Sequence, residues 1–301
     1  MAGSFTPIDL SKLPKPSVVE IIDYEAILVD MIVDLQKREP SFTALVESDP
    51  AYKVLEVCAC REMLLRQRAN DSASAVMLAY AEKEDLDNIG ANYDCARLTI
   101  QHEDNTTIPP APAVMEDDDP YRARIQLSMQ GFSCAGPMGA YQYFAKSASG
   151  DVLDVSVTTP SGGTVLVSIL SRTGNGAAPD ATIQAVRLVL NADSVRPLCD
   201  TVRVESAQIV EYSISAVLTL LNGADATTVL ANANASGAGY ALARHKNGRP
   251  VSLAGWYGAL CVAGVEDVAF QAPGLVANLM ISPIQASYCT SLSVTIGGSS
   301  D

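Results

Sequence analysis

The four-residue stretch Val152-Leu153-Asp154-Val155 returns, with a single change, as Val265-Glu266-Asp267-Val268. Each copy leads after the same gap to a proline, Pro160 or Pro273, so that matching positions lie 113 residues apart. A glycine stands close upstream of each copy, and a helix-like segment with two aromatic residues precedes it. Valine favours strands and proline interrupts them, so each copy is typical of a strand that follows a helix and stops at the proline. The repeat predicts two related α+β modules rather than one active site.

The composition is that of a globular chain with an acidic surface. Its 301 residues suffice for two or three domains, and 48% of them are hydrophobic while only 18% are charged. The formal net charge is −14, with 34 acidic residues against 20 lysines and arginines. Binding a nucleic acid requires many cations to neutralise phosphates, so we expect no nucleic-acid partner. Any partner should be neutral or basic where it touches this chain.

The cysteines and the amino terminus indicate a product that is cytosolic when made. The cysteine count, seven, is odd, and no Cys-x-x-Cys occurs, which favours buried thiols in a reducing compartment. Cys58 and Cys60 would point to different faces of a helix, which argues against a shared metal ion. Residues 1–16 lack the apolar core of a signal peptide, and no apolar run is long enough to span a membrane.

The first helical segment follows a proline-containing arm. Residues 1–16 indicate either an extended arm lying on a neighbour or a mobile terminus. Apolar residues then recur at helical spacing, and Pro40 ends the pattern. These residues are Tyr24, Ile27, Leu28, Met31, Ile32 and Leu35. They predict a helix with one apolar stripe.

The strongest helix prediction covers residues 50 to about 80. Asp49 can cap this helix and Pro50 fits its first position, after which no Gly or Pro intervenes before Tyr80. One seam alternates in steps of three and four through Ala51, Leu55, Cys58, Glu62, Leu65, Ala69, Ser72, Val76 and Ala79. A rod of about 45 Å outgrows a compact core, so we expect part of the seam to pack on another chain. The alternative is a long helix buried wholly within its own chain.

The remaining segments define the domain organisation that we expect. A helical region (1–98) is followed by a linker (99–119) that ends in the acidic run 116–119, and then by two α+β modules (120–199 and 200–301). A short helix through Asp85-Leu86-Asp87 to a glycine cap at Gly90 closes the helical region. Further helices are expected after Pro120 and at 138–148, 180–192, 225–243 and 252–262, and strands at 151–158, 164–171, 201–206, 210–221, 265–271 and 288–296.

The chain shows no pattern that indicates an enzyme. Its two histidines, His102 and His245, have no nucleophile or carboxylate at motif spacing, and no phosphate-binding or metalloprotease motif occurs. The run 116–119 lacks the alternation of a calcium loop, so we interpret it as a solvated linker ending in a helix cap. Asp154 and Asp267 are expected to bind turn amides or an arginine. We therefore predict no catalytic, cofactor-binding or metal-binding residues.

Several phrases, in a fixed order along about residues 50–301, resemble the baseplate J-like protein family of contractile-tailed phages and R-type pyocins. Arg196-Pro197-Leu198-Cys199-Asp200 is similar to the family's Arg-Pro-Leu-Thr-Asp turn, with a cysteine in place of the usual threonine. We assign Arg196, Pro197 and Asp200 a structural role in that turn. The other matching phrases lie at 62–70, 85–87, 136–170, 212–225 and 264–268.

The resemblance implies a non-enzymatic wedge subunit of a tail baseplate, assembled in the host bacterial cytoplasm and located in a virion or pyocin particle. Two copies of such a subunit join one protein I-like partner through a helix bundle, here formed by Leu55, Cys58, Glu62, Leu65, Ala69 and Val76. A lysozyme-related, protein W-like wedge protein is a further partner, and six wedges form a ring around the hub. Two alternatives are a tail-associated hydrolase and a monomeric ligand-binding module.

Overall fold

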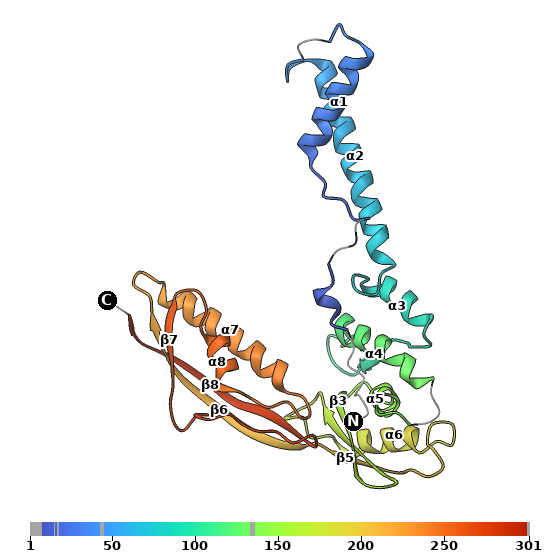
Figure 1. Ribbon diagram of the computed structural model, residues 1–301, viewed down its shortest axis with the longest axis vertical. Helices are drawn as coiled ribbons and strands as arrows, with labels where there is room; N and C mark the ends of the chain where they lie inside the picture. Colours follow the sequence, from blue (N-terminus) through green and yellow to red (C-terminus); the bar gives the residue numbers. More distant parts are fainter. Residues whose placement is uncertain (1–7, 15, 17, 43–44, 133–135, 300–301) are drawn as a thin grey trace. The chain divides into compact units, whose positions relative to one another are not determined.

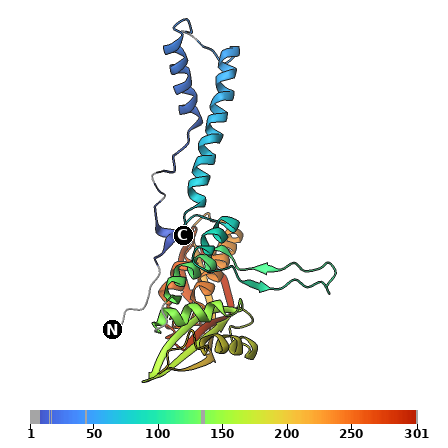
Figure 2. The ribbon, with the colours of Figure 1, turned by 90° about the vertical axis from the view of Figure 1, so that its right-hand side faces the viewer.

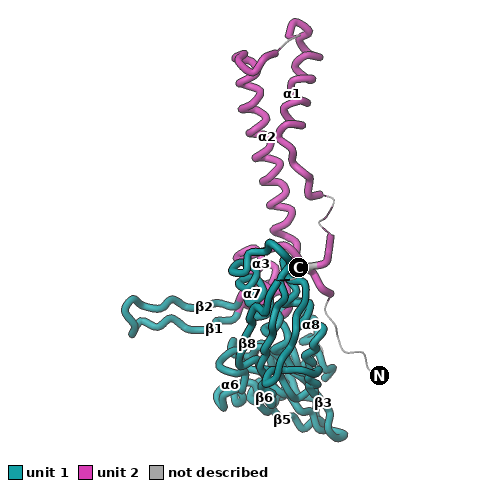
Figure 3. Tube along the Cα trace, turned by 90° about the vertical axis from the view of Figure 1, so that its left-hand side faces the viewer, with its two compact units in different colours: residues 1–6, 98–116, 124–301 teal, residues 7–97, 117–123 magenta. Residues whose placement is uncertain are grey.

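The computed structural model describes residues 8–14, 16, 18–42, 45–132 and 136–299. Cys134 and the first seven residues of the expected arm lie outside the described residues. The chain divides into two compact units (Figure 3). Residues 7–97 and 117–123 form one, called here the helical unit, and residues 98–116 and 124–301 belong to the other, called the sheet unit.

The helical unit is built around a pair of adjacent helices (Figures 1 and 2). After the short 3-10 helix η1 (Leu10–Lys12), α1 (Tyr24–Arg38) packs against α2 (Pro50–Ala75). Ile27 and Leu28 of α1 are buried against Ala59 of α2. The apolar stripe expected on the first helix is therefore confirmed as its packing face, and the helix ends at Arg38, just before Pro40.

Helix α2 differs from the prediction at both ends. Pro50 does occupy the first turn, but the Asp49 carboxylate accepts from the Val46 amide, at 3.0 Å, and makes no capping bond to the helix. The helix stops at Ala75 rather than near Tyr80, and its 26 residues give a length of about 39 Å. The chain bends there because Arg122 donates to the carbonyls of Leu78 and Ala81, which a continuing helix would use internally.

Helices α3 (Lys83–Ala91) and the start of α4 (Asp118–Gly131) complete the helical unit. Gly90 lies inside α3 and is not the glycine cap expected after it. A Cβ at Gly90 would lie 2.0 Å from the Tyr121 hydroxyl and 2.7 Å from the Cys95 carbonyl. Gly90 is thus required by the close approach of α4 rather than by the end of α3.

The sheet unit begins with a hairpin that sequence patterning did not predict. Strands β1 (Thr99–Gln101) and β2 (Val114–Met115) pair antiparallel, and the arm that joins them reaches out from the rest of the unit (Figure 2). The acidic run that follows is not a solvated linker. Glu116 is buried and forms an ion pair with buried Arg124 at 2.6 Å. Asp118 and Asp119 also have cationic partners, Arg97 and Arg122, so most of this acidic run is engaged in ion pairs.

The first larger sheet has the order β3-β4-β5. Its elements follow one another as α5 (Met138–Ser147), β3 (Val152–Ser161), β4 (Thr164–Ser171), α6 (Asp180–Leu190) and β5 (Thr201–Ser206). Strand β3 is antiparallel and β5 is parallel to the central strand β4. The helices pack on the sheet through Tyr141, Val186 and Leu190, which meet the buried Val167 and Ile169.

The second larger sheet has the order β7-β6-β8. Its elements are β6 (Gln208–Leu220), α7 (Ala226–Arg244), α8 (Leu253–Leu260), β7 (Val265–Phe270) and β8 (Gln285–Ser299). Asp225 caps α7 by accepting from the amides of Thr227 and Thr228. Trp256 of α8 is fully buried in the core of this module. The central strand β6 again has one antiparallel neighbour, β7, and one parallel neighbour, β8.

The repeated phrase occupies the same structural position in both sheets. Each copy lies on the outer strand that runs antiparallel to the central one, β3 or β7. The residue after the first valine, Leu153 or Glu266, is an extra residue in the pairing, that is, a β-bulge. The bulge lets two valines three residues apart face the same core, and both valines of each copy are buried. The phrase therefore encodes a bulged edge strand.

The two modules nevertheless differ in chain order and in the role of the proline. In the first sheet the chain forms the antiparallel outer strand β3 first, then the central strand β4 and then the parallel outer strand β5. In the second sheet the chain forms the central strand β6 first, and the two outer strands β7 and β8 follow. Strand β3 continues through Pro160 to Ser161, which an outer strand tolerates, while Pro273 lies beyond the end of β7 at Phe270. The expectation that each strand stops at its proline is wrong for Pro160. The predicted α+β class, a long-helix region followed by two related modules with mixed sheets, is confirmed.

Candidate functional site

Helix α2 has two distinct faces. The face toward α1 carries Tyr52, Leu55, Ala59 and Met63, which pack with the α1 stripe. Farther along the same face, the buried Asn70 side chain exchanges two hydrogen bonds with the backbone of Glu20, at 3.0 and 2.9 Å. This face is the one that α2 uses within its own chain.

The opposite face is exposed yet largely apolar. We call it the open face; it consists of Val54, Val57, Cys58, Arg61, Leu64, Leu65, Arg68, Ala69 and Ser72, all of them exposed. At 3.6 residues per turn these nine fall within a sector of about 140°, on the far side from Ala59. Val54 is 62%, Val57 61% and Leu65 67% exposed. Large apolar side chains gathered on one face, rather than scattered singly, are typical of an interaction surface.

The predicted seam straddles these two faces. Leu55 turns toward α1, and Glu62 holds Arg66 beside it in an ion pair. Cys58, Leu65 and Ala69 lie on the open face. A straight α-helix drifts by about 20° per heptad relative to a 3.5-residue repeat, so a heptad seam read from the sequence does not follow one face of α2.

Val76 lies just past the end of α2, and its side chain is 75% exposed. Sequence reasoning missed Val54, Val57 and Leu64. Val57 follows Val54 by three residues and Leu64 follows Val57 by seven, which is helical spacing. This spacing indicates a second apolar stripe once the first stripe is taken as the face that packs on α1.

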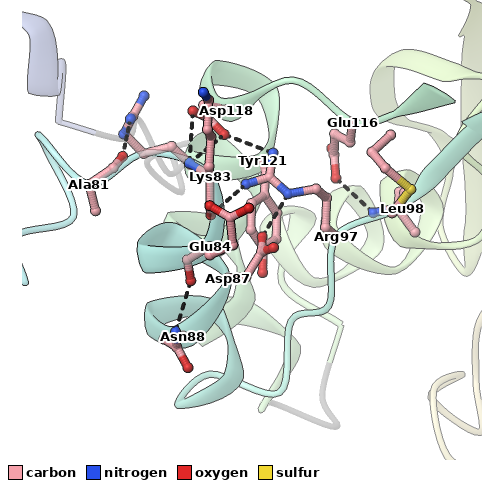
Figure 4. A network of polar contacts seen from close by, with 12 residues as sticks. Ala81, Lys83, Glu84, Asp87, Asn88, Arg97, Leu98, Glu116, Asp118 and Tyr121 are labelled. Atoms are coloured by element: carbon pink, nitrogen blue, oxygen red, sulfur yellow. Dashed lines mark hydrogen bonds and ion pairs between the residues drawn. The ribbon is translucent and has the colours of Figure 1, made fainter. Parts of the chain in front are cut away.

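A polar network in the helical unit joins α3 to the start of α4 (Figure 4). The Arg97 guanidinium lies between Asp87, at 2.6 Å, and Asp118, at 2.8 Å, and stacks 4.6 Å from the centroid of the Tyr121 ring. The buried Tyr121 hydroxyl donates to the Cys95 carbonyl at 2.6 Å. Burial would raise the pKa of Asp118, but hydrogen bonds from Arg97 and the Lys83 amide outweigh it and lower that pKa below the ordinary value. Sequence spacing gave no signal for this network, because Arg97 and Asp118 are distant in the chain.

The predicted turn residues meet α5 within the sheet unit. The Tyr141 hydroxyl donates to Asp200 at 2.7 Å, and burial together with this bond raises the pKa of Tyr141 far above its usual range. The Asp200 amide donates to the Pro197 carbonyl, which closes the turn, and the Arg196 amide donates to Ala192. The structure therefore brings Pro197 and Asp200 together beside Tyr141.

The matched aspartates of the repeat have different surroundings. Asp154 forms an ion pair with Lys146 at 3.1 Å and accepts from the Asn247 amide at 3.1 Å, so it links the first sheet to the second module. Leu170, Ala207 and Ala286 form a small buried cluster that also joins the two modules. Among the described residues, the Asp267 carboxylate accepts one exposed hydrogen bond, from the Tyr257 hydroxyl at 3.0 Å, and this bond raises the pKa of Tyr257.

The described part of the chain contains no cluster of three or more His, Cys, Asp or Glu side chains able to hold a metal ion. His245, one of the two histidines, lies beside the Ser287 carbonyl at 2.6 Å. No helix among the described residues is both long and apolar enough to cross a membrane. The open face of α2 is therefore the strongest functional feature of these residues.

Comparisons with known proteins agree with the resemblance seen in the sequence. The model of the baseplate J-like N-terminal domain matches residues 47–104, and that of the baseplate J-like central domain matches residues 133–206. A chain of the anti-feeding prophage baseplate, a six-fold symmetrised cryo-EM structure, is 12% identical with a TM-score of 0.40, covering 61% of this chain and 44% of that one. Baseplate protein J of Escherichia phage P2 is 46% identical over 98% of this chain and 99% of its own length. This chain belongs to the baseplate J-like family.

Proposed function

We propose that this chain is a wedge subunit of a contractile-tail baseplate, in a phage or an R-type pyocin, and that the open face of α2 binds the other wedge chains. Its family membership supports a structural role in a tail baseplate. The observation that carries the finer proposal is the open face itself, an apolar sector directly opposite the one that α1 covers. An exposed apolar surface of this extent is typical of a protein–protein contact.

The size of the open face fits a helix-bundle contact. From Val54 to Ser72 it extends for about 27 Å along α2, five turns of helix. Its large apolar residues, Val57, Leu64 and Leu65, are interspersed with the exposed arginines Arg61 and Arg68, so the face offers both apolar area and charge to a partner. We propose that a second copy of this chain and a protein I-like partner complete this bundle, and that a protein W-like chain joins the same wedge.

The second module, residues 200–301, is proposed to connect neighbouring wedges into a six-fold ring. It displays exposed apolar side chains at Leu242, Val276 and Met280, which are 74%, 58% and 77% exposed. These lie outside the core around Trp256, so they are available for a contact without unfolding the module. Assembly in the host cytoplasm and the four-segment domain organisation (1–98, 99–119, 120–199, 200–301) belong to the same proposal.

Light scattering on the purified chain, alone and after co-expression with the protein I-like partner, tests the wedge assignment. We expect a stable complex with two copies of this chain and one of the partner. A chain that stays monomeric in the presence of that partner would refute the assignment. For the ring, a Leu242→Asp and Met280→Asp double variant should still form wedges but should not close rings in electron micrographs; intact rings would contradict the proposed contact.

A further inference from the structure

Two arginines stand in the middle of the open face without an ion pair among the described residues. Arg61 and Arg68 are both exposed, and the described salt bridges do not include them. Of the other charged groups on α2, Lys53 holds Glu56 at 2.9 Å, Arg66 holds Glu62, and Asp71 accepts from the Gln67 side chain at 2.7 Å. Arg61 and Arg68 are therefore exceptions among the cations of their own helix.

Their neighbours on the helix surface make the exception more specific. The positions three and four residues from Arg61 on either side are Val57, Cys58, Leu64 and Leu65, none of them charged. Leu64 and Leu65 also stand four and three residues before Arg68, while Asp71, three residues after it, bonds to Gln67 and forms no ion pair with Arg68 among the described residues. The two guanidiniums lie seven residues or about 10.5 Å apart, with apolar side chains between them.

A partner that covers the apolar side chains must also cover these cations. Removing a guanidinium from water without a counter-charge is costly, whereas pairing it with a carboxylate in a bidentate bond offsets that cost. The chain as a whole is strongly acidic, with a formal net charge of −14, so it supplies no general reason for a basic patch here. The occupant of the open face has to bring its own carboxylates.

A second copy of this helix can join the bundle, but it does not supply the carboxylates that the two arginines need. In a parallel, in-register pair each arginine would face its own counterpart. In an antiparallel pair centred between Leu64 and Leu65, Arg61 of one copy would face Arg68 of the other. Both arrangements place like charges together inside the contact, which disfavours association.

We propose that the open face binds a helix of the protein I-like partner that carries two acidic side chains one heptad apart, one for Arg61 and the other for Arg68. This inference rests on the wedge function proposed above and adds the chemistry of the partner. In this arrangement the apolar residues provide the affinity, and the two arginines determine the register and the choice of partner. A partner helix shifted along α2 would leave both cations unpaired.

The test is a titration of the purified full-length chain with the purified protein I-like partner at low and high salt. The Arg61→Glu/Arg68→Glu variant should weaken binding by at least about 100-fold. The Arg61→Gln/Arg68→Gln variant should bind more weakly than the wild type at low salt, with a smaller salt dependence. Reversing one pair of partner acids spaced seven residues apart should restore binding to the Glu variant.

Lys53→Glu is the matched control, because it reverses a charge on the same helix at a cation already paired within the chain. It should change binding by less than about threefold. Circular dichroism confirms that each variant keeps its helix content.

If the Glu variant binds like the wild type while Leu65→Asp abolishes binding, the acidic-partner proposal is refuted and the wedge function stands. If Leu65→Asp also binds normally, the wedge function fails as well. If the wild-type chain self-associates through this face, so that Leu65→Asp breaks the homodimer without weakening partner binding, the face belongs to a second copy and the proposal is overturned.

Discussion

Truncating Leu65 to alanine measures what the open face contributes to assembly. The Leu65 side chain is 67% exposed in the free chain. Complete burial of a leucine side chain stabilises by about 1.5–3 kcal/mol, so the part still available to a partner is worth about 1–2 kcal/mol. Leu65→Ala should therefore raise the Kd for the protein I-like partner about 5- to 30-fold. Leu65→Asp should abolish co-purification, because it adds a carboxylate that competes for Arg61 and Arg68.

The assay is isothermal titration with the two purified chains, and Leu188 provides the matched control. Leu188 lies on α6 in the sheet unit and is 76% exposed. Leu188→Ala should leave the Kd unchanged, and neither substitution should alter the free energy of unfolding of the free chain by more than about 0.5 kcal/mol. Equal Kd values for Leu65→Ala, Leu188→Ala and the wild type would refute the reasoning.

Three further predictions concern the stability of the helical unit and of the sheet unit. The pKa of Asp118 is lower in the folded chain than its unfolded value of 3.8. The stability that the ionised carboxylate contributes is therefore complete above pH 3.8 and is lost as the pH falls through the folded pKa. Asp118→Asn should remove the part of the decrease in Tm on acidification that this carboxylate causes. Gly90→Ala should lower the unfolding free energy by about 1–3 kcal/mol. Gly239→Ala, with nothing within 4 Å, should raise it by about 0.5–1 kcal/mol in the same denaturant titration. Asp154→Ala should destabilise by about 1–3 kcal/mol, and Asp267→Ala by less than about 0.5 kcal/mol; equal effects would contradict the unequal roles of these aspartates.

Much of the fold follows from periodicity, because the elements are long and their apolar patterns are regular. The helix over Tyr24–Arg38 and the strands Thr164–Ser171 and Thr201–Ser206 match the expected ranges closely. The doubled phrase located both modules, but it could not reveal their different chain order, since local sequence does not encode which strand lies at the centre of a sheet. Nor could it reveal the bulge, which needs the partner strand to define it.

The polar framework was less predictable for a different reason. Glu116 was expected in solvent because its neighbours in the chain are acidic, yet it is buried on Arg124. Gly90 was expected as a cap because it follows the short helical segment through Asp85-Leu86-Asp87, yet Tyr121 occupies the space where a side chain would be. In both cases the deciding partner comes from α4. Pairings of that kind depend on tertiary packing, which a single sequence does not display.

The candidate surface was predicted in part. Sequence patterning also chose the long helix and included Cys58 and Leu65. It also included Leu55, which packs against α1, and Glu62, which forms an ion pair with Arg66. This happened because one apolar stripe was expected where the helix has two. The predicted surface did not include Arg61 and Arg68, since isolated basic residues on a helix are common. Their significance depends on the absence of an ion pair to either arginine among the described residues.

Alkylation of two native cysteines tests the central claim most directly. Cys58 lies on the open face, while Cys60, also exposed, points about 200° away around the same helix. In the free chain both thiols should react with a maleimide, as read by mass spectrometry of the labelled peptides. In the complex with the protein I-like partner, Cys58 should be protected and Cys60 should react as before. Equal labelling of Cys58 in the free chain and in the complex would contradict the claim that the open face of α2 is where the wedge assembles.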